Sequence, residues 1–466
     1  MQSDSKTGTL KLANNKPKRA AVILAAGQGT RMKSKLSKVL HKVAGLAMID
    51  WVIDLAKNLG CEKIIVVTGA HNQDATTKVI AQLGKAAHAL QDPPLGTGHA
   101  VLCAKAALAG FDGNVIVLYA DTPLITHETA SKAFAALENG ASVAVLGFEA
   151  KDAGSYGRLV ENQNGDLLEI VEAKEASVQQ LAINLCNSGV MAANSANLFA
   201  HLDNVTDDNA KGEYYLTDVV GLAVKAGQKC VAVRGIEDEV LGVNSRAELA
   251  IAEQVWQTKR RKQAMVAGVT LVAPETVFFA YDTKVENDVT IEPNVVFGVG
   301  VTIDSGAHIK SFSHIEGANI ASGAIIGPFA RLRAGSEIGE DVHIGNFVET
   351  KNAKLAKGVK ANHLTYLGDV TIGKNTNIGA GTITCNYDGY FKYQTKIGEG
   401  VLIGSDTMLV APVAIGNFAM TGSGSTITKD VPEGALSLER GPQKTIENWA
   451  TKFHERSKKA KAEARK

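Results

Sequence analysis

The chain has 466 residues, and at roughly 150 residues per domain this length predicts two or three domains, each able to bury a core. Its 49 basic and 48 acidic side chains give a formal net charge of +1, which argues against nucleic acid or an acidic membrane surface as a partner. The five scattered cysteines include no C-x-x-C pair, which argues against a disulfide framework or a structural zinc site.

Residues 1–19 are polar, and we expect them to form an N-terminal extension that lacks the apolar stretch of a signal peptide. No apolar run reaches the roughly 18 residues that a membrane-spanning helix needs. We therefore expect a cytoplasmic protein that acts on small molecules and binds neither nucleic acid nor a membrane.

Residues 20–245 alternate short apolar runs with helix-compatible stretches. Such alternation predicts an α/β domain with a Rossmann-like, mostly parallel sheet, covered on both faces, with ligands at the carboxyl ends of its strands. The predicted strands are Ala20–Ala25, Lys63–Thr68, Asn114–Tyr119, Ser142–Phe148, Ser188–Ala192 and Cys230–Arg234, and the predicted helices include Ala47–Asn58 and Ala100–Ala109.

A glycine-rich loop, Gly27-Gln28-Gly29-Thr30-Arg31, follows the first strand. A dinucleotide fingerprint would need glycine where Met32 stands, and the G-K-[ST] of a kinase-type phosphate loop is absent. The backbone N–H groups of this loop, with Arg31 and Lys38 nearby, suit a triphosphate. From the residues alone, a purely structural turn is an equal alternative.

Three further features point to the same edge of the sheet. Asp121 follows an apolar strand, where a carboxylate can hold Mg²⁺ against phosphate oxygens. Gly96-Thr97-Gly98 precedes a helix and offers a close backbone approach to a ligand. Asn244 stands just before a capping-box pattern at Ser245, beside the positive end of a helix. The alternative for Asp121 is a helix-cap or turn role. The alternative for Asn244 is a simple turn residue, and for Asn244 the spacing by itself favours this alternative.

The helix that begins at Arg246 is predicted to run to about Ala267 and to end at Gly268, so residues 246–268 form a linker between the two halves. Residues 441–466 form a tail with the basic end RSKKAKAEARK. We interpret this tail as a solvated terminus; the alternative is a nucleic-acid contact.

In residues 269–440 apolar side chains recur every six positions, as at Ile291, Phe297, Ile303 and Ile309. A period of six fits neither a helix nor an ordinary strand, and it predicts a left-handed parallel β-helix of hexapeptide repeats. Three hexads close one triangular coil, and coils stack about 4.8 Å apart. Glycine often follows the aliphatic residue, as in Ile344-Gly345, and we expect it to supply turn conformations.

Two interruptions of the repeat carry candidate catalytic residues, because loops that leave a solenoid often carry function. His363 lies in the first, with Glu349, Lys351 and Tyr366 nearby in sequence, and Asn386-Tyr387 lies in the second. A neutral imidazole can take a proton from an amine near pH 7. A packed or solvated His363 is an equal alternative at this point.

Five motifs carry a resemblance to a known family: LAAGQGTRM (Leu24–Met32), LGTGHA (Leu95–Ala100), NHLTYLGD (Asn362–Asp369), NIGAGTITCNYDG (Asn377–Gly389) and GSDTMLVAPV (Gly404–Val413). The chain resembles the bacterial bifunctional N-acetylglucosamine-1-phosphate uridylyltransferase/glucosamine-1-phosphate acetyltransferases from about Arg19 to Arg440. The resemblance implies acetylation of glucosamine-1-phosphate by acetyl-CoA, then Mg²⁺-dependent transfer from UTP to give UDP-N-acetylglucosamine and pyrophosphate, for cell-wall precursors. It also implies a homotrimer whose acetyl sites are shared between subunits.

The resemblance also implies a role for individual residues. In the uridylyl site it implies nucleotide contacts for Leu24, Ala25, Ala26, Gly27, Gln91, Gly96 and Thr97, phosphate contacts for Arg31 and Lys38, sugar contacts for Gly157, Glu172 and Asn187, and Mg²⁺ ligation by Asp121 and Asn244. In the acetyl site it implies His363 as general base, sugar-phosphate contacts for Arg333, Lys351, Tyr366 and Asn377, and acetyl-CoA contacts for Ala380, Asn386, Tyr387, Ser405, Ser423 and Arg440.

Three positions depart from the family pattern: Ser37 where proline is frequent, Ala120 where glycine or serine is common, and Ser423 where alanine is frequent. We expect Ser37 to loosen its turn, while none of the three removes a charge or a proposed base. Two alternative functions are a hexose-1-phosphate nucleotidyltransferase with a non-catalytic β-helix and a sugar-nucleotide-binding regulatory subunit. His363 and the NYDG loop argue against the first, and Arg31, Lys38 and Asp121 argue against the second.

Overall fold

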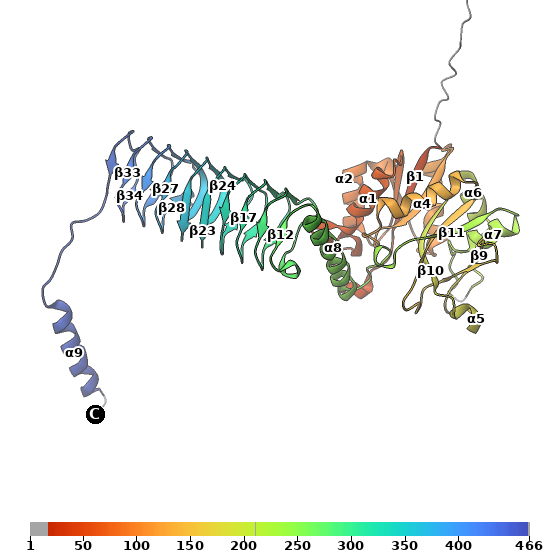
Figure 1. The fold of residues 1–466 in the computed structure, drawn as a ribbon. Coiled ribbons are helices and arrows are strands. Elements are labelled where there is room, and N and C mark those ends of the chain that lie inside the picture. The colour runs from red at the N-terminus through yellow and green to blue at the C-terminus, as the bar shows by residue number, and fades with distance from the viewer. Residues whose placement is uncertain (1–16, 210, 465–466) are drawn as a thin grey trace, which may run out of the picture. The chain divides into compact units, whose positions relative to one another are not determined.

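The computed structural model describes residues 17–209 and 211–464 (Figure 1). Most of the predicted N-terminal extension lies outside the described residues. The chain divides into two compact units, and the boundary falls after Arg260.

The first unit is built on a mixed sheet with the strand order β11-β7-β10-β6-β1-β4-β5. β1 is central and pairs in parallel with β4 and β6, whereas β10 is antiparallel to β6 and β7, so the sheet is mostly parallel. An antiparallel hairpin, β8 and β9, extends from β10. The strands are β1 Arg19–Ala25, β4 Lys63–Gly69, β5 His88–Gln91, β6 Asn114–Tyr119, β7 Val143–Glu149, β8 Arg158–Glu161, β9 Leu167–Val171, β10 Leu185–Asn194 and β11 Cys230–Arg234, with a small separate pair β2 Lys42–Val43 and β3 Leu46–Ala47.

Helices cover both faces of this sheet because the apolar side chains of its strands alternate between two cores. Ala21 and Ile23 of β1 face the core formed with α1, α2 and α4, whereas Ala20 and Val22 face the core formed with α3, α6 and α7. The helices are α1 Met48–Asn58, α2 Gln73–Leu83, α3 Thr97–Cys103, α4 His127–Glu138, α5 Val178–Leu181, α6 Ser195–Leu202, α7 Asp218–Lys225 and α8 Arg246–Val266, with short 3-10 turns at Thr30–Met32, Lys38–Leu40, Lys85–Ala87, Ala106–Leu108 and Glu237–Glu239.

The predicted helix Ala100–Ala109 is wrong in its second half. The α-helix ends at Cys103, where the Ala104 N–H bonds to the Val101 carbonyl oxygen at 3.0 Å, and a 3-10 turn follows. The tighter i→i+3 pattern is a common way to close a helix end, and alanine-rich composition alone did not predict it.

The second unit is a parallel β-helix, as the period of six predicts. Each coil contributes one strand to each of three stacked rows. The buried aliphatics line up from coil to coil, and Ile291, Ile309, Ile326 and Ile344 are all at most 1% exposed. Row A is β12 Thr270–Leu271, β14 Thr290–Ile291, β17 His308–Ile309, β20 Ile325–Ile326, β23 His343–Asn346, β25 Lys360–His363, β27 Asn377–Ile378, β30 Leu402–Ile403, β33 Met420–Thr421 and β35 Leu436–Ser437.

The other two rows share the long strands β24 and β26, each of which passes from one row to the next. Row B is β15 Val296–Phe297, β18 His314–Ile315, β21 Arg331–Leu332, the start of β24 Glu349–Leu355, the start of β26 Tyr366–Ile372, β28 Ile383–Cys385, β31 Met408–Val410 and β34 Thr426–Ile427. Row C is β13 Lys284–Val285, β16 Thr302–Ile303, β19 Ala318–Ile320, β22 Ser336–Ile338, the ends of β24 and β26, β29 Thr395–Ile397 and β32 Val413–Ile415. A 3-10 turn at Pro274–Thr276 follows β12 within the first coil, and α9 Trp449–Glu463 follows the last coil.

Except for Gly327, the glycines that directly follow the inward aliphatics do not have the positive φ of turn residues, so that expectation is wrong for them. None of Gly339, Gly345, Gly373 and Gly404 has a positive φ. A Cβ at Gly345 would instead lie 1.9 Å from the carbonyl oxygen of Asn362 in the next coil. These glycines therefore permit close stacking of successive coils, and the positive-φ turns lie elsewhere in the repeat, at glycine, Asn, Asp and some Phe residues.

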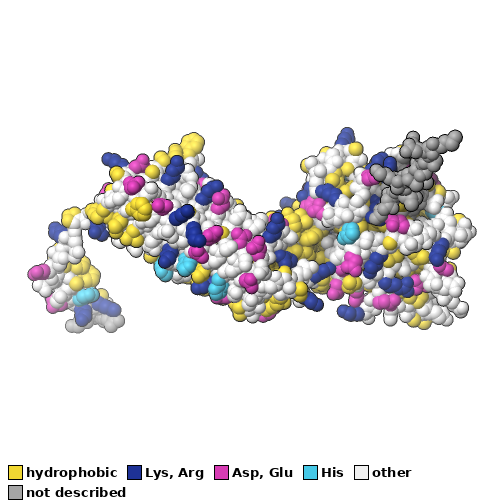
Figure 2. All heavy atoms as spheres, turned by 45° about the horizontal axis from the view of Figure 1, so that its top comes forward, with side chains coloured by type: hydrophobic (Ala, Val, Ile, Leu, Met, Phe, Trp, Pro, Cys, Tyr) yellow, Lys and Arg dark blue, Asp and Glu magenta, His cyan; other side chains and the backbone are white. Residues whose placement is uncertain are grey.

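Two observations concern the surface. Basic and acidic side chains are interspersed on the face of the β-helix seen in Figure 2, in keeping with the balanced composition. Among the described residues, no helix combines the length and the apolar character needed to cross a membrane.

Candidate active sites

Three predicted residues of the first unit meet at the carboxyl end of the sheet. Lys38 precedes β2, Asp121 follows β6, and Asn244 precedes α8. The Lys38 ammonium forms an ion pair with Asp121 Oδ2 and donates to Asn244 Oδ1 at 3.0 Å. A backbone bond from Val243 N–H to the Asp121 carbonyl oxygen, 2.8 Å, fixes Asn244 beside Asp121.

The carboxylate of Asp121 and the amide oxygen of Asn244 thus converge on one cationic position. Hard oxygen donors of this kind are the ligands that Mg²⁺ prefers, and it usually keeps few protein ligands beside substrate phosphates and water. In keeping with this, the described residues contain no cluster of three His, Cys, Asp or Glu side chains that could cage a metal by themselves. The donor set fits magnesium.

The glycine-rich loop packs directly on Lys38. A Cβ at Gly29 would lie 2.7 Å from the Cβ of Lys38, and Gly29 has a φ of +62°. A Cβ at Gly27 would lie 3.9 Å from the Lys38 Nζ, so the loop and the ammonium line the same space. Leu24 and Ala25 are buried at the end of β1, while Arg31 lies exposed on the 3-10 turn Thr30–Met32.

Hydrogen bonds to other segments of the chain hold the second predicted glycine loop, Gly96-Thr97-Gly98. Gln91 Nε2 donates to the Gly96 carbonyl oxygen at 2.9 Å, and Thr97 Oγ1 accepts from Leu216 N–H at 3.1 Å. Gly96 has a φ of +105°, and a Cβ there would lie 2.7 Å from the Tyr214 carbonyl oxygen. Glycine is required at this position by the packing of the Tyr214 segment.

The predicted sugar residues lie around the β8–β9 hairpin and β10. Asn187 N–H donates to the Gly157 carbonyl oxygen at 2.8 Å, and Asn187 Oδ1 accepts from Gly189 N–H at 2.8 Å. Burial raises the pKa of Glu172, the nearby Lys211 ammonium opposes that shift, and Glu175 adds to it.

Tyr119 lies among the predicted site residues, and the sequence did not single it out. Burial raises the pKa of its phenol, and the carboxylates of Asp121 and Glu172 raise it further, so the phenol lies near both groups. A Cβ at Gly189 would lie 2.8 Å from the Tyr119 ring. The only available signal was its place at the end of β6, two residues before Asp121.

In the β-helix, register places His363 beside Asn346. The two residues pair across β23 and β25, and His363 Nδ1 lies 3.0 Å from Asn346 Oδ1. Because an amide oxygen only accepts, we assign Nδ1 as the protonated nitrogen, which leaves Nε2 with a free lone pair. Asn346 was missed from the sequence, although it stands one coil, 17 residues, before His363.

Arg333 after β21, Lys351 of β24 and Lys392 of the loop after β28 form a cationic cluster. Arg333 Nη1 is 2.8 Å from Glu349 Oε1, and Glu349 pairs in register with Tyr366. The pKa of Lys351 is lowered, first by the adjacent Lys392 ammonium and then by Arg333. Lys392 is a further residue that the sequence did not single out, because it belongs to the loop that interrupts the repeat.

Of the remaining predicted residues, Asn377 lies on β27 and Arg440 follows β35, while the others occupy stacked turns between rows A and B and the loop after β28. Asn377 pairs with Lys360 at the start of β27, and Asn386 Nδ2 bonds to Asp369 Oδ2. Tyr387 is exposed and its hydroxyl bonds to the Gly389 carbonyl oxygen. Backbone bonds between successive turns place Ala380, Ser405 and Ser423 one above another, and Arg440 Nη1 donates to the Ser423 carbonyl oxygen at 3.0 Å.

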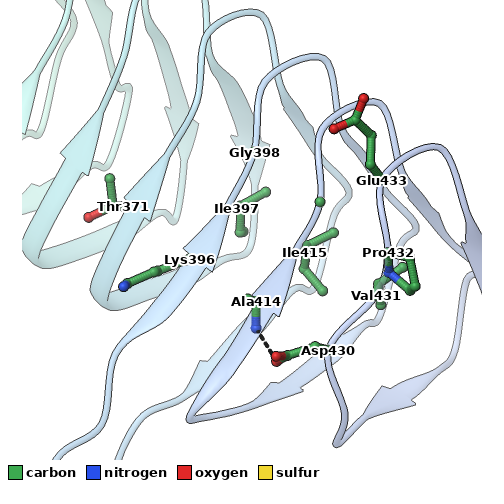
Figure 3. A pocket seen from close by; sticks show the side chains of 11 residues that line it. Thr371, Lys396, Ile397, Gly398, Ala414, Ile415, Asp430, Val431, Pro432 and Glu433 are labelled. Atoms are coloured by element: carbon green, nitrogen blue, oxygen red, sulfur yellow. Dashed lines mark hydrogen bonds between the residues drawn. The ribbon is translucent and has the colours of Figure 1, made fainter.

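A groove of about 540 Å³ lies on a different face, over row C of the last coils (Figure 3). It is lined by Thr371, Lys396, Ala414 and neighbouring residues, and Ala414 N–H donates to Asp430 Oδ1 across it at 2.8 Å. None of the predicted site residues lines this groove.

The fold and the two sites define a class of protein: a nucleotidyltransferase joined to a hexapeptide-repeat acyltransferase. Residues 21–217 match the family model of the MobA-like NTP transferase domain. The chain is 57% identical over 444 residues to the bifunctional protein GlmU of Maricaulis maris, covering 95% of this chain and 98% of the relative. It is 56% identical to GlmU of Caulobacter vibrioides, with coverage of 93% and 94%, and 52% identical to GlmU of Sphingopyxis alaskensis, with coverage of 96% and 99%.

The chain therefore belongs to the GlmU family of bifunctional proteins. It is a bifunctional transferase that N-acetylates glucosamine-1-phosphate with acetyl-CoA and transfers a uridylyl group from UTP to N-acetylglucosamine-1-phosphate, with Mg²⁺ as cofactor. Its product, UDP-N-acetylglucosamine, is a precursor of cell-wall peptidoglycan.

Proposed function

We propose that the cluster of Lys38, Asp121 and Asn244 is the centre of the uridylyl site. Asp121 and Asn244 would hold Mg²⁺, which when bound neutralises phosphate charge. Lys38 and Arg31 bind the phosphates, and the backbone from Leu24 to Gly27, with Gln91, Gly96 and Thr97, surrounds the nucleotide. Gly157, Glu172 and Asn187 hold the sugar, whose phosphate attacks the α-phosphorus of UTP in line. Positioning and charge neutralisation account for most of the rate, and no protein nucleophile is needed.

For acetyl transfer, we assign His363 Nε2 as the base that takes a proton from the sugar amine. The bond from Nδ1–H to Asn346 fixes the tautomer that this role requires, and this is the observation that carries the assignment. The lone pair of the amine attacks the thioester carbonyl as Nε2 takes the amine proton; the C–S bond then breaks, and the CoA thiolate takes up that proton from His363 and leaves as the thiol. Arg333, Lys351, Tyr366, Asn377 and the newly found Lys392 bind the sugar phosphate, and Ala380, Asn386, Tyr387, Ser405, Ser423 and Arg440 bind acetyl-CoA.

Reciprocal variants test the two-site assignment. His363→Ala removes the base, so release of CoA thiol should fall by at least about 100-fold, while pyrophosphate release from UTP stays at the wild-type rate. Asp121→Ala should have the opposite effect. Each variant's second activity is its own folding control. Loss of both activities in a folded single variant would refute separate sites.

We also propose that the protein is a homotrimer, because one edge of the β-helix carries an exposed apolar ladder. Phe312, Phe329, Phe347 and Leu364 occupy the turns between rows A and B, are 46% to 61% exposed, and all have a positive φ. Their rings stack, with centroids 4.9 Å apart for Phe312–Phe329 and 5.2 Å for Phe329–Phe347. Such a stripe marks a contact surface, and it ends beside His363. Sedimentation of the intact protein tests the subunit number.

We assign the enzyme to the cytoplasm, where UTP and acetyl-CoA are made, and its five free cysteines fit a reducing compartment. Fractionation of cells followed by assay of both activities tests this. We propose residues 20–245 and 269–440 as the two catalytic domains, with 246–268 as the linker and 441–466 as the tail.

A further inference from the structure

Asp74, in the first turn of α2, forms two hydrogen bonds with the residue that precedes Lys38. Ser37 N–H donates to Asp74 Oδ2 at 2.9 Å, and the Ser37 hydroxyl donates to Asp74 Oδ1. Burial would raise the pKa of this carboxyl group, but the bonds from Ser37 and Ala75 outweigh it and hold the pKa below its usual value. The carboxylate is therefore ionised throughout the neutral range. The expectation that Ser37 loosens its turn is wrong, since these bonds tie it down.

The neighbouring Asn72 connects the same point to the glycine-rich loop. Asn72 is buried, its Nδ2 donates to the Ala25 carbonyl oxygen at 3.0 Å and lies 3.4 Å from that of Gly27, and its Oδ1 lies 3.3 Å from the Ser37 hydroxyl. The start of α2 thus forms hydrogen bonds with both segments next to the Lys38 ammonium, the glycine-rich loop and Ser37.

We propose that Asp74 is a positioning residue for uridylyl transfer, which acts through Ser37 to place the Lys38 ammonium for the triphosphate of UTP. Asp74 touches no substrate in this scheme. Lys38 follows Ser37 directly, so backbone motion at Ser37 is passed on to the backbone of Lys38. The Lys38 ammonium must stay near Asp121 and Asn244, and such motion would displace it. The inference rests on the proposed role of Lys38.

The backbone conformation at Ser37 suggests how the hydrogen bonds between Asp74 and Ser37 can be replaced. Ser37 has φ −52° and ψ 138°, which proline also adopts. Proline would remove the N–H that needs Asp74 and would fix φ through its ring. A Ser37→Pro substitution should therefore make Asp74 dispensable.

The test compares KM for UTP in the full-length protein, with acetyl transfer as the internal control for folding. Asp74→Ala should raise KM for UTP by about tenfold, with a smaller rise for Ser37→Ala, which keeps the N–H bond. The double variant Ser37→Ala/Asp74→Ala should have the same KM for UTP as Asp74→Ala alone, because the two substitutions remove the same interaction. Ser37→Pro/Asp74→Ala should return KM to within about twofold of wild type.

Glu128→Ala is the matched control, since it removes an exposed acidic side chain from the first turn of α4 without touching the loop. It should leave KM unchanged. A wild-type KM in Asp74→Ala, or fully independent effects of Asp74→Ala and Ser37→Ala, would overturn the proposal. If Lys38→Ala left KM for UTP unchanged, the proposed role of Lys38 would fail instead, which separates the two.

Discussion

Lys351 carries an electrostatic cost that the sugar phosphate can relieve. Its pKa lies below the usual lysine value because the Lys392 ammonium lies beside it and Arg333 adds to the repulsion, which Asp369 only partly offsets. Three cations held together without an equal number of anions form a ready site for a phosphate dianion. We therefore expect the clustering that makes Lys351 harder to protonate to favour binding of the sugar phosphate.

This cluster predicts proton uptake when glucosamine-1-phosphate binds. In the free enzyme Lys351 loses its proton at a lower pH than an ordinary lysine does, and the bound phosphate raises that pKa again. Affinity should therefore fall as pH rises through the free-enzyme pKa of Lys351. Titration calorimetry at alkaline pH below the usual lysine pKa, in two buffers of different ionisation enthalpy, measures the uptake.

Lys392→Met should raise the pKa of Lys351, reduce the proton uptake and weaken binding by about fivefold. Lys354→Met is the control, because Lys354 pairs with Glu337 at 2.8 Å on row C. Equal proton uptake in wild type and Lys392→Met would show that Lys392 does not act on Lys351.

At the scale of elements, the sequence predicts the strands and helices that follow a repeating pattern, but it does not predict contacts that depend on the register between neighbouring coils. The period of six located the buried aliphatics of the β-helix, and alternation located β1, β4, β6 and β11. Asn346 was missed because its partner His363 is 17 residues away, and nothing local marks that pairing. Lys392 was missed because a loop outside the period brings it to Lys351.

The glycines of the repeat show the same limit. The sequence shows that glycine often follows the aliphatic residue. It does not show whether such a glycine forms a turn or allows close stacking, because that depends on the position of the neighbouring coil. Gly345 has an ordinary φ and only the backbone of Asn362 excludes a side chain there.

Gly345→Ala should destabilise the β-helix by about 2–3 kcal/mol, because the added methyl group forces two coils apart. It should also impair acetyl transfer, since Asn346 follows directly. Gly221→Ala is the matched control: Gly221 lies within α7 with nothing within 4 Å of an added Cβ, so the change should stabilise its helix by about 0.5–1 kcal/mol. Thermal unfolding monitored by both activities measures each effect, and a wild-type transition for Gly345→Ala would contradict the stacking role.

At the scale of the whole molecule, the two chemistries have different structural requirements. The uridylyl cluster is assembled from residues of one unit within one chain, around Lys38 and Asp121. The acetyl residues lie along an open edge of a coil, beside the exposed ladder of Phe312, Phe329, Phe347 and Leu364. An open edge gives a substrate few walls, and a neighbouring subunit on the ladder would supply them. Only acetyl transfer should therefore depend on assembly.

Phe329→Glu tests this dependence. A carboxylate in the middle of the ladder would have to be desolvated in the interface, so the variant should sediment as a monomer and lose at least about 90% of acetyl transfer, a cost of roughly 1.4 kcal/mol or more. Pyrophosphate release from UTP should stay at the wild-type rate. Phe418→Glu is the matched control, because Phe418 is also exposed with φ +56° but lies in a turn between β32 and β33, on another edge. A trimeric, active Phe329→Glu would show that the ladder is not the interface, and dissociation of both variants would show that the contact is not confined to this edge.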